Sequence, residues 1–166
     1  MIIQKETIIS KDLDKKKLFV EREFDAPVAL VWRAWTESSL LDQWWAPRPW
    51  KAKTKSMEFK EGGRWLYSMV GPDGEEQFCR ADYETIVPQK QFTASDAFCD
   101  EKGNATNEMP SMHWKNVFTP TDNGTRVAIE ISFDSVADLE KIVEMGFKEG
   151  FTAAHGNLDE LLAQLQ

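Results

Sequence analysis

The sequence has only two cysteines, Cys79 and Cys99, among its 166 residues. Two cysteines are too few for a disulfide framework, and these two are not spaced as a Cys-x-x-Cys zinc or redox motif. The chain also has no apolar run of 18 residues, and its first ten residues lack the basic and apolar regions of a signal peptide. We therefore expect a cytoplasmic protein with reduced thiols and no membrane contact.

Basic residues are scarce relative to acidic ones, with 20 Lys and Arg against 28 Asp and Glu and a formal net charge of −8. No stretch concentrates enough positive charge to follow a phosphate backbone, so we expect no nucleic-acid partner. The sequence contains no Gly-x-Ser-x-Gly, no His-Glu-x-x-His, no phosphate-binding glycine loop and no dinucleotide fingerprint. The motifs therefore assign no catalytic residue, no cofactor and no metal site.

Aromatic residues, in contrast, are abundant. Seven Trp and ten Phe are a large share for a chain of this length, and they suit a deep core or an apolar pocket. A chain of 166 residues is large enough to bury roughly 70% of its unfolded surface in one core. With no internal repeat and no linker in the sequence, we expect a single domain over residues 1–166.

The strongest periodic signal lies at the C-terminal end. Apolar residues recur there at spacings of three and four: Phe147, Phe151, Ala154, Leu158, Leu161 and Leu165. This pattern predicts an amphipathic helix, with Asn157 on the water-facing side. Ser135 and Asp138 resemble a capping box upstream, and Gly146 or Gly150 is expected to interrupt the helix once. We therefore predict a short helix followed by a longer one.

The preceding elements are mostly strands. Residues 2–24 are predicted to be extended, with a polar break at 11–17 that suggests a hairpin. Two short helices follow, one opened by Asp25 and the first-turn Pro27, the other near Ser38. From residue 51 onward apolar and polar residues alternate, as is typical of strands, and several glycine-rich turns interrupt this alternation. This order predicts an α+β fold, in which a curved antiparallel sheet of about six to seven strands wraps around the long C-terminal helix, with two short helices after the first strand.

The turn at Pro88-Gln89 predicts a register as well as a hairpin. In a tight hairpin, residues whose numbers sum to about 178 face each other, which sets Cys79 opposite Cys99 within one position. The thiols should stay reduced in a reducing compartment. Air would join them in a disulfide if they formed a close pair.

Five groups of short motifs occur in order along the sequence. They are Phe24-Asp25-Ala26-Pro27 with Val31-Trp32-Arg33-Ala34-Trp35, Gln43-Trp44-Trp45-Ala46-Pro47, Gly62-Gly63-Arg64-Trp65, Gly71-Pro72-Asp73-Gly74 and Gly146-Phe147-Lys148-Glu149-Gly150-Phe151. Together they resemble the activator of heat-shock-protein-90 ATPase homologue family, a branch of the START-like (SRPBCC) superfamily of helix-grip proteins, over about residues 18–165. Two positions depart from the usual pattern: many relatives have Gly at position 46, and Trp is commoner than Phe at position 151.

The resemblance implies a helix-grip fold that holds a hydrophobic ligand between the sheet and the C-terminal helix, and it brings no catalytic residue with it. The eukaryotic co-chaperone of the family also uses a separate N-terminal domain, for which we expect no room in this chain. We favour non-enzymatic binding of a small hydrophobic molecule. A chaperone-interacting domain that uses its outer surface, and an enzyme acting on a hydrophobic, polyketide-like substrate, stay open, as do a monomer and a homodimer.

The candidate ligand-binding residues lie mid-strand opposite the helix and on the helix itself. They are aromatic with a few polar tips: Trp65, Tyr67, Met69, Tyr83, Trp114, Asn116, Phe147, Phe151 and His155. Plain core packing is the alternative for the strand residues. Bulk introduced from the helix at Ala154 is expected to block the cavity.

Two further pairs of residues admit a structural and a functional interpretation. Trp44 and Trp45 are expected to plug one end of the core rather than to stack on a ligand. His113 is expected to face solvent and His155 to lie on the flank of the helix. If the two histidines met in the cavity, they would supply an acid and a base and favour the enzyme, whereas two nitrogens without a third ligand are poor evidence for zinc.

Overall fold

The computed structural model describes residues 6–106 and 109–166, which form twelve helices and strands. In chain order these are β1 (Ile8–Asp12), β2 (Lys17–Phe24), α1 (Val28–Thr36), α2 (Ser38–Trp44), β3 (Lys51–Met57), β4 (Arg64–Val70), β5 (Glu76–Val87), β6 (Gln91–Cys99), β7 (Met112–Pro120), β8 (Thr125–Ser132), α3 (Val136–Glu144) and α4 (Phe147–Gln164). Residues 2–5, predicted to be extended, lie outside the described ranges. Within those ranges, no helix combines the length and the apolar character needed to cross a membrane.

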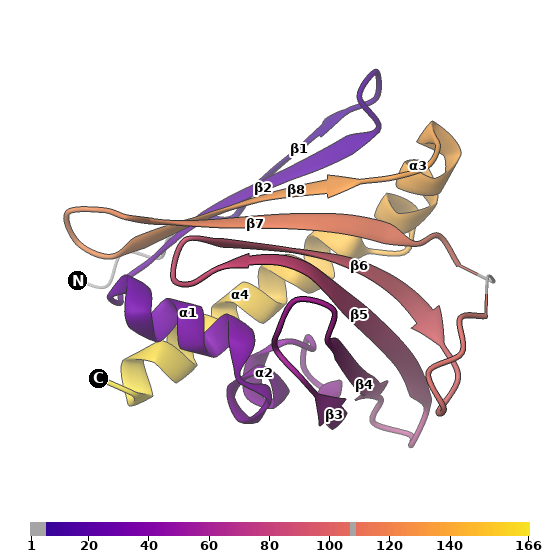
Figure 1. Ribbon diagram of the computed structural model, residues 1–166, viewed down its shortest axis with the longest axis horizontal. Coiled ribbons are helices and arrows are strands. Elements are labelled where there is room, and N and C mark those ends of the chain that lie inside the picture. Colours follow the sequence, from indigo (N-terminus) through magenta and orange to yellow (C-terminus); the bar gives the residue numbers. More distant parts are fainter. Residues whose placement is uncertain (1–5, 107–108) are drawn as a thin grey trace.

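All the strands belong to one antiparallel sheet in the order β1-β2-β8-β7-β6-β5-β4-β3 (Figure 1). The sheet curves around α4, which lies against its inner face. This confirms the predicted α+β fold. The sheet has eight strands rather than six to seven, because the N-terminal segment contributes both β1 and β2.

The helix α4 buries most of the predicted stripe: Phe151, Ala154, Leu158 and Leu161. Two expectations drawn from this pattern, the burial of Leu165 and the exposure of Asn157, were wrong. Leu165 is 41% exposed because it follows the last residue of the helix. Asn157, expected in water, is buried because its Nδ2 donates a hydrogen bond to the Ala46 carbonyl at 3.1 Å and so joins α4 to the segment after α2.

The break between α3 and α4 falls at Gly146. Ser135 caps α3 as predicted, with its Oγ accepting a hydrogen bond from the Asp138 amide at 3.1 Å. Gly146 is the N-cap residue of α4 and has a φ of 94°. A residue with a Cβ atom would be strained in this backbone conformation, whereas glycine adopts it readily. Gly150 lies inside α4.

The helices α1 and α2 close one end of the core. Pro27 is the N-cap residue of α1 rather than a first-turn residue, so Asp25 does not occupy the predicted capping position. Trp44 is completely buried, and its indole N–H donates a hydrogen bond to the Ala34 carbonyl at 2.9 Å. The predicted structural role of Trp44 is confirmed, since its ring holds α2 against α1.

The hairpin of β5 and β6 has the predicted register to within one residue. Cys79 pairs with Phe98, and Phe78 pairs with Cys99. The register changes between Tyr83 and Ile86, where the ladder is irregular. Because side chains alternate between the two faces of a sheet, this offset of one residue directs Cys79 inward and Cys99 outward. The two cysteines therefore do not form the close pair on which the predicted disulfide in air depended. Both are buried and free.

Candidate functional site

A cavity of about 210 Å³ lies between the inner face of the sheet and the junction of α3 with α4. Strands β4 to β7 form one wall, and the helices form the other. The side chains that enclose the space are mainly apolar: Tyr67, Met69, Cys79, Phe98, Met112 and Trp114 from the sheet, and Ile142, Met145, Phe147 and Phe151 from the helices.

The space exists because small side chains occupy the middle of the inner face. Cys79 and Ala81 on β5 and Ala94 on β6 point inward. Their neighbours in the sheet carry large rings, with Tyr67 on β4 opposite Cys79 and Trp114 on β7 opposite Ala94. Within β5 and β6 themselves, Phe98 pairs with Cys79 and Tyr83 pairs with Ala94. Large rings therefore surround these small side chains, and the space beneath α4 opens over the small ones.

A second cavity of about 40 Å³ continues toward α1 and α2. It is large enough for two or three water molecules at roughly 15 Å³ each. Four residues line both cavities, namely Trp45, Tyr67, Asp96 and Trp114. We call these four the junction residues, because they form the boundary at which the two spaces meet.

Hydrogen bonds order the junction residues. The Trp114 indole N–H donates to Asp96 Oδ2 at 2.8 Å, and the Trp45 indole N–H donates to the Tyr67 hydroxyl at 3.0 Å. The rings of Trp45 and Trp114 lie 5.9 Å apart between centroids. The other carboxylate oxygen, Asp96 Oδ1, is buried and accepts no hydrogen bond of good geometry from the described residues.

The apolar surroundings change the acidity of the groups in the cavity. Burial raises the pKa of Asp96 to about 7, although the Trp114 indole and the Met112 amide beside the carboxyl group act in the opposite direction. Burial also raises the pKa of Cys79 to about 12, with a further contribution from the nearby Asp96. Among the described residues that line either cavity there is no Lys, Arg or His. The Asp96 carboxylate therefore faces no positive side chain there.

The sequence-based candidates are divided between the two cavities. Tyr67, Met69, Trp114, Phe147 and Phe151 line the large cavity. Trp65, Tyr83 and Asn116, together with Tyr67 and Trp114, line the small one.

His155 lines neither cavity. It is 1% exposed, its Nδ1 lies 3.0 Å from Thr7 Oγ1, and its ring centroid lies 4.2 Å from that of Phe151. Burial, with a smaller contribution from Arg22, lowers the pKa of His155 to about 3. The expected flank position of His155 was therefore wrong, since the ring is a neutral part of the core.

The two histidines lie on different faces of the sheet. The His113 side chain is 42% exposed, as predicted, and its Nε2 lies 3.1 Å from Glu84 Oε1. Because His155 lies on the inner side, no acid and base pair of the kind that the enzyme hypothesis needs is formed by these residues. Nowhere in residues 6–106 and 109–166 do three His, Cys, Asp or Glu side chains gather in a way that could hold a metal ion.

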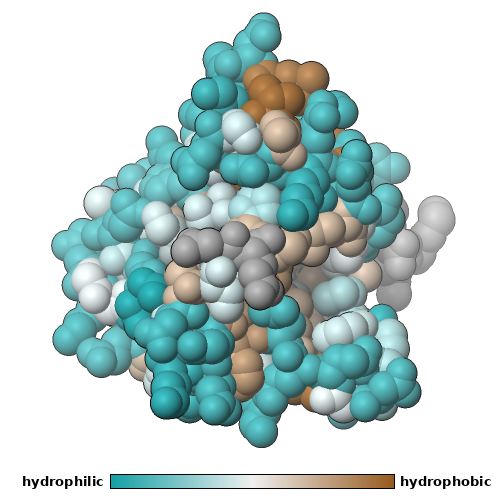
Figure 2. Space-filling model, turned by 90° about the vertical axis from the view of Figure 1, so that its right-hand side faces the viewer, coloured by the Kyte–Doolittle hydropathy of each residue, from teal (hydrophilic) through white to brown (hydrophobic). Residues whose placement is uncertain are grey.

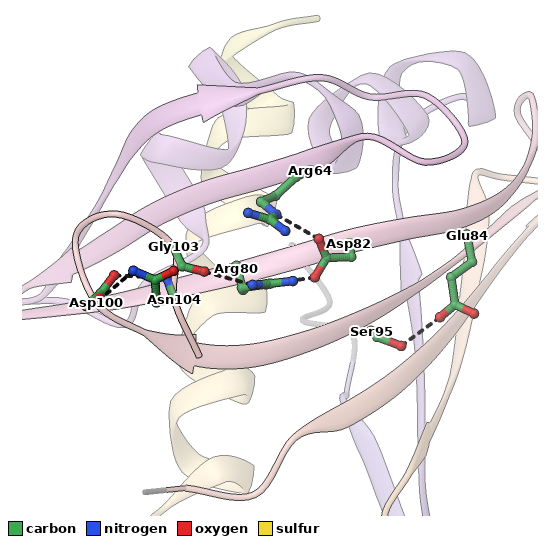
Figure 3. A network of polar contacts seen from close by, with 8 residues as sticks. All are labelled: Arg64, Arg80, Asp82, Glu84, Ser95, Asp100, Gly103 and Asn104. Atoms are coloured by element: carbon green, nitrogen blue, oxygen red, sulfur yellow. Dashed lines mark hydrogen bonds and ion pairs between the residues drawn. The ribbon is translucent and has the colours of Figure 1, made fainter. Parts of the chain in front are cut away.

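The outer face of the sheet carries a network of charged and polar residues (Figure 3). Asp82 accepts hydrogen bonds from Arg64 Nε at 2.7 Å and from Arg80 Nε at 2.9 Å, and Arg80 Nη1 also donates to the Gly103 carbonyl at 2.8 Å. These contacts hold the loop after β6 against the sheet. Figure 2 looks onto the end of the molecule that contains this loop, where the surface is mainly hydrophilic and the hydrophobic areas are small and separate.

Comparison with known proteins places the chain in a family. The sequence model described as activator of Hsp90 ATPase homolog 1-like protein matches residues 25–163. The chain belongs to this family. No curated protein matches the sequence.

Solved structures support membership of the activator of Hsp90 ATPase homolog 1-like family. The chain is similar to protein Ms6760 from Mycobacterium smegmatis, with 30% identity, a TM-score of 0.87 and coverage of 95% of this chain and 96% of that one. A protein from Arthrobacter aurescens gives 32% identity, a TM-score of 0.89 and coverage of 95% and 91%. A protein from Nitrosomonas europaea gives 28% identity and a TM-score of 0.80, with coverage of 90% and 96%.

Asp96 and Trp45 are among the residues that line the cavities of this family member and that sequence reasoning missed. Asp96 follows Phe92 and Ala94 at inward positions of β6, so an acid in an apolar alternation was the available signal. Trp45 was expected to plug the core, but it is half-buried and lines both cavities.

The helix residue chosen to block the cavity was also wrong. Ala154 is buried but does not line either cavity, whereas Gly150, one turn earlier in α4, lines the large one. The spacing of apolar residues identified the buried stripe of α4. It did not show which residues of α4 line the cavity.

Proposed function

We propose that this chain binds a small hydrophobic molecule, without catalysis, in the cavity between the sheet and α4. The cavity itself carries the proposal, because its walls are mainly aromatic and aliphatic and contain few polar groups, among them Asp96 and the Tyr67 hydroxyl. Binding sites for small molecules have this composition: an apolar lining gives affinity, and a few polar groups fix the orientation of the ligand.

The size of the cavity limits the ligand. Pockets for drug-sized molecules enclose about 300–1,000 Å³, whereas an engineered apolar cavity of about 150 Å³ binds benzene. The 210 Å³ found here therefore suits a molecule with one ring or a short branched chain. A ligand would also restore the dispersion contacts that wall atoms lack when they face an empty space.

An apolar dye and a pair of variants test the proposal. A Cβ at Gly150 would lie 3.7 Å from Pro47 Cγ, an ordinary contact, so Gly150→Leu adds bulk to the cavity without a clash at the backbone. A Cβ at Gly156, in the exposed part of the same helix, would meet no atom within 4 Å, so Gly156→Leu is the matched control. The measurements are titration of dye fluorescence and thermal unfolding with and without dye.

We expect the dye to bind the parent protein and the Gly156→Leu variant with one-to-one stoichiometry and to raise the stability of both. The gain should be about 2.7 kcal/mol at a dye concentration of about a hundred times Kd. Gly150→Leu should remain folded and lose the binding. Equal binding by Gly150→Leu and the parent would contradict the proposal.

A chaperone-interacting domain is the alternative suggested by the family description. Such a domain would work through its outer surface. The charged residues Arg64, Arg80 and Asp82 on that surface bind one another and the loop after β6, which favours the cavity as the functional site. Gly150→Leu also distinguishes the two functions when chaperone binding is measured beside dye binding, because a contact through the outer face would survive a change to the inside of the protein.

A further inference from the structure

We propose that the ligand is a small apolar amine whose ammonium group binds at the junction residues, with Asp96 as its carboxylate partner. This inference rests on the proposed ligand-binding function and names the chemical class of the ligand. The apolar part of the amine would occupy the 210 Å³ cavity, and the charged group would lie where that cavity meets the smaller one.

The first observation that supports an amine is the incomplete hydrogen bonding of Asp96. One oxygen accepts the Trp114 indole N–H, and the other, Oδ1, is buried and accepts no hydrogen bond of good geometry from the described residues, although the Met112 amide lies beside the carboxyl group. Buried polar atoms in folded proteins almost always have a partner, and a buried carboxylate without one is costly. An ammonium group carries three donors and a positive charge, so it supplies both the hydrogen bond and the counter-charge.

The second observation is the aromatic character of the other junction residues. Trp45, Tyr67 and Trp114 adjoin both cavities beside Asp96. The faces of aromatic rings attract cations, most strongly when the cation is removed from water, and cages of such rings recognise ammonium groups. Three rings and one carboxylate around the same space form a site for a cation rather than for an anion.

The third observation is the charge of the surroundings. The titratable groups that face Asp96 are Tyr67 on β4 and Cys79 on β5, and both keep their protons at neutral pH because burial raises their pKa values. The described cavity residues of α3 and α4 carry no charge. A net charge of −8 also attracts cations to the molecule as a whole. An anionic ligand would be repelled, and a neutral alcohol would leave the carboxylate without a counter-charge.

Water is the competing partner for Asp96. Trp35 Nε1 and Asn116 Oδ1 are also buried without partners, and both residues line the small cavity. Water molecules in that cavity would satisfy these groups. If water alone were also the partner of Asp96 Oδ1, an amine would have no advantage over a neutral molecule of the same shape.

Three probes of similar shape and different charge test the inference: benzylamine, benzyl alcohol and benzoate. Their binding to the full chain is measured by isothermal titration calorimetry at pH 8 and low salt. The variants are Asp96→Asn, which keeps the shape of the side chain, and Asp122→Asn, which removes the same charge from the exposed turn between β7 and β8. Circular dichroism and thermal unfolding establish that each variant is folded.

We expect the parent protein to bind benzylamine at least about tenfold more tightly than benzyl alcohol, and benzoate more weakly than either. Asp96→Asn should weaken benzylamine binding at least about tenfold and change benzyl alcohol binding by less than about twofold. Asp122→Asn should bind all three probes as the parent does. Benzylamine should also bind the parent more tightly at pH 8 than at pH 5, because the pKa of Asp96 is about 7 and only the ionised form attracts a cation.

Equal affinity of the parent for benzylamine and benzyl alcohol would overturn the inference and leave the proposed ligand-binding function standing. Undiminished benzylamine binding by Asp96→Asn would do the same. If neither the probes nor the apolar dye bound the parent protein, both the inference and the proposed function would fail.

Discussion

The chemistry of Asp96 depends on its position at an inward-facing site of β6, where burial raises the pKa of its carboxyl group to about 7. The unfolded chain titrates this group near its ordinary pKa of about 3.9. The folded protein therefore binds more protons than the unfolded chain between these two values. The stability that protonated Asp96 contributes is complete below pH ~4 and is lost as the pH rises through about 7.

The Asp96→Asn variant tests this dependence. Asn cannot ionise, so it avoids the cost of a buried charge, which the rise of the Asp96 pKa from its ordinary value to about 7 sets at about 4 kcal/mol at pH 8. The variant should be more stable than the parent by about that amount at pH 8, and nearly equal to it at pH 4. Urea unfolding at the two pH values measures the difference. A constant difference across this pH range would show that Asp96 does not titrate in the folded state as described.

Trp44 and Trp45 are adjacent in sequence but have different environments. Trp44 is completely buried, so Trp44→Ala should lower the free energy of unfolding by about 3–5 kcal/mol. Trp45 is half-buried and lines both cavities, so Trp45→Ala should cost less stability and alter dye binding more. Chemical denaturation and dye titration of both variants provide the comparison. Two variants as stable as the parent would contradict the described packing of both rings.

At the scale of elements, the glycine at the N-cap of α4 and a glycine in the exposed part of α4 should respond to alanine in opposite directions. Gly146 has a φ of 94°, so Gly146→Ala should destabilise the protein by about 1–2 kcal/mol. Gly156 lies within α4 and a Cβ there would meet nothing within 4 Å, so Gly156→Ala should stabilise it by about 0.4–1 kcal/mol. Urea unfolding measures both changes, and shifts of the same sign would contradict this description of the helix.

Elements were predictable from the sequence because local signals determine them. The Ser135 cap, the break between α3 and α4 and the turn between β5 and β6 are all local features, and each was located correctly. Asn157 could not be placed in the same way, because its partner is a carbonyl 111 residues away. The irregularity between Tyr83 and Ile86 could not be predicted from the sequence either. It shifts the register by one residue, and this shift places the two cysteines on opposite faces of the sheet.

For the whole molecule, the sheet has two edges, β1 and β3. The edge strand β3 carries Lys51, Lys53 and Lys55 in exposed positions, and its pairing with β4 is irregular between Thr54 and Ser56. Lysines and bulges at an edge discourage pairing with another chain. They therefore protect the open side of this sheet.

The double variant Lys51→Val with Lys53→Val removes part of that protection and should increase aggregation at high protein concentration. Light scattering over time at a fixed temperature measures the effect. The control is Lys15→Val with Lys102→Val, which removes the same charge from exposed turns. Equal aggregation of the two double variants would assign the effect to net charge rather than to the edge.

The architecture of the molecule was more predictable than its cavity. The family motifs and the hydrophobic periods together specify a curved sheet around α4, but both describe what is buried rather than what is left empty. The cavity depends on the small side chains of Cys79, Ala81 and Ala94 facing the same side of β5 and β6, which follows only from the exact register. Asp96 was overlooked for the same reason, since its surroundings come from three other strands and a helix.

Because Cys79 and Cys99 point to opposite faces of the sheet, their thiols would report on two different regions of the protein in a labelling experiment. The sheet between them is one layer thick, with Cys79 facing the cavity and Cys99 beneath the loop after β6, where it bridges to Ala105. Burial raises the pKa values of both thiols, so alkylation at neutral pH is slow. The labelling rate of Cys79 should therefore measure access of the reagent to the cavity, and that of Cys99 should measure access beneath the loop after β6, so one unmodified chain gives two separate readings.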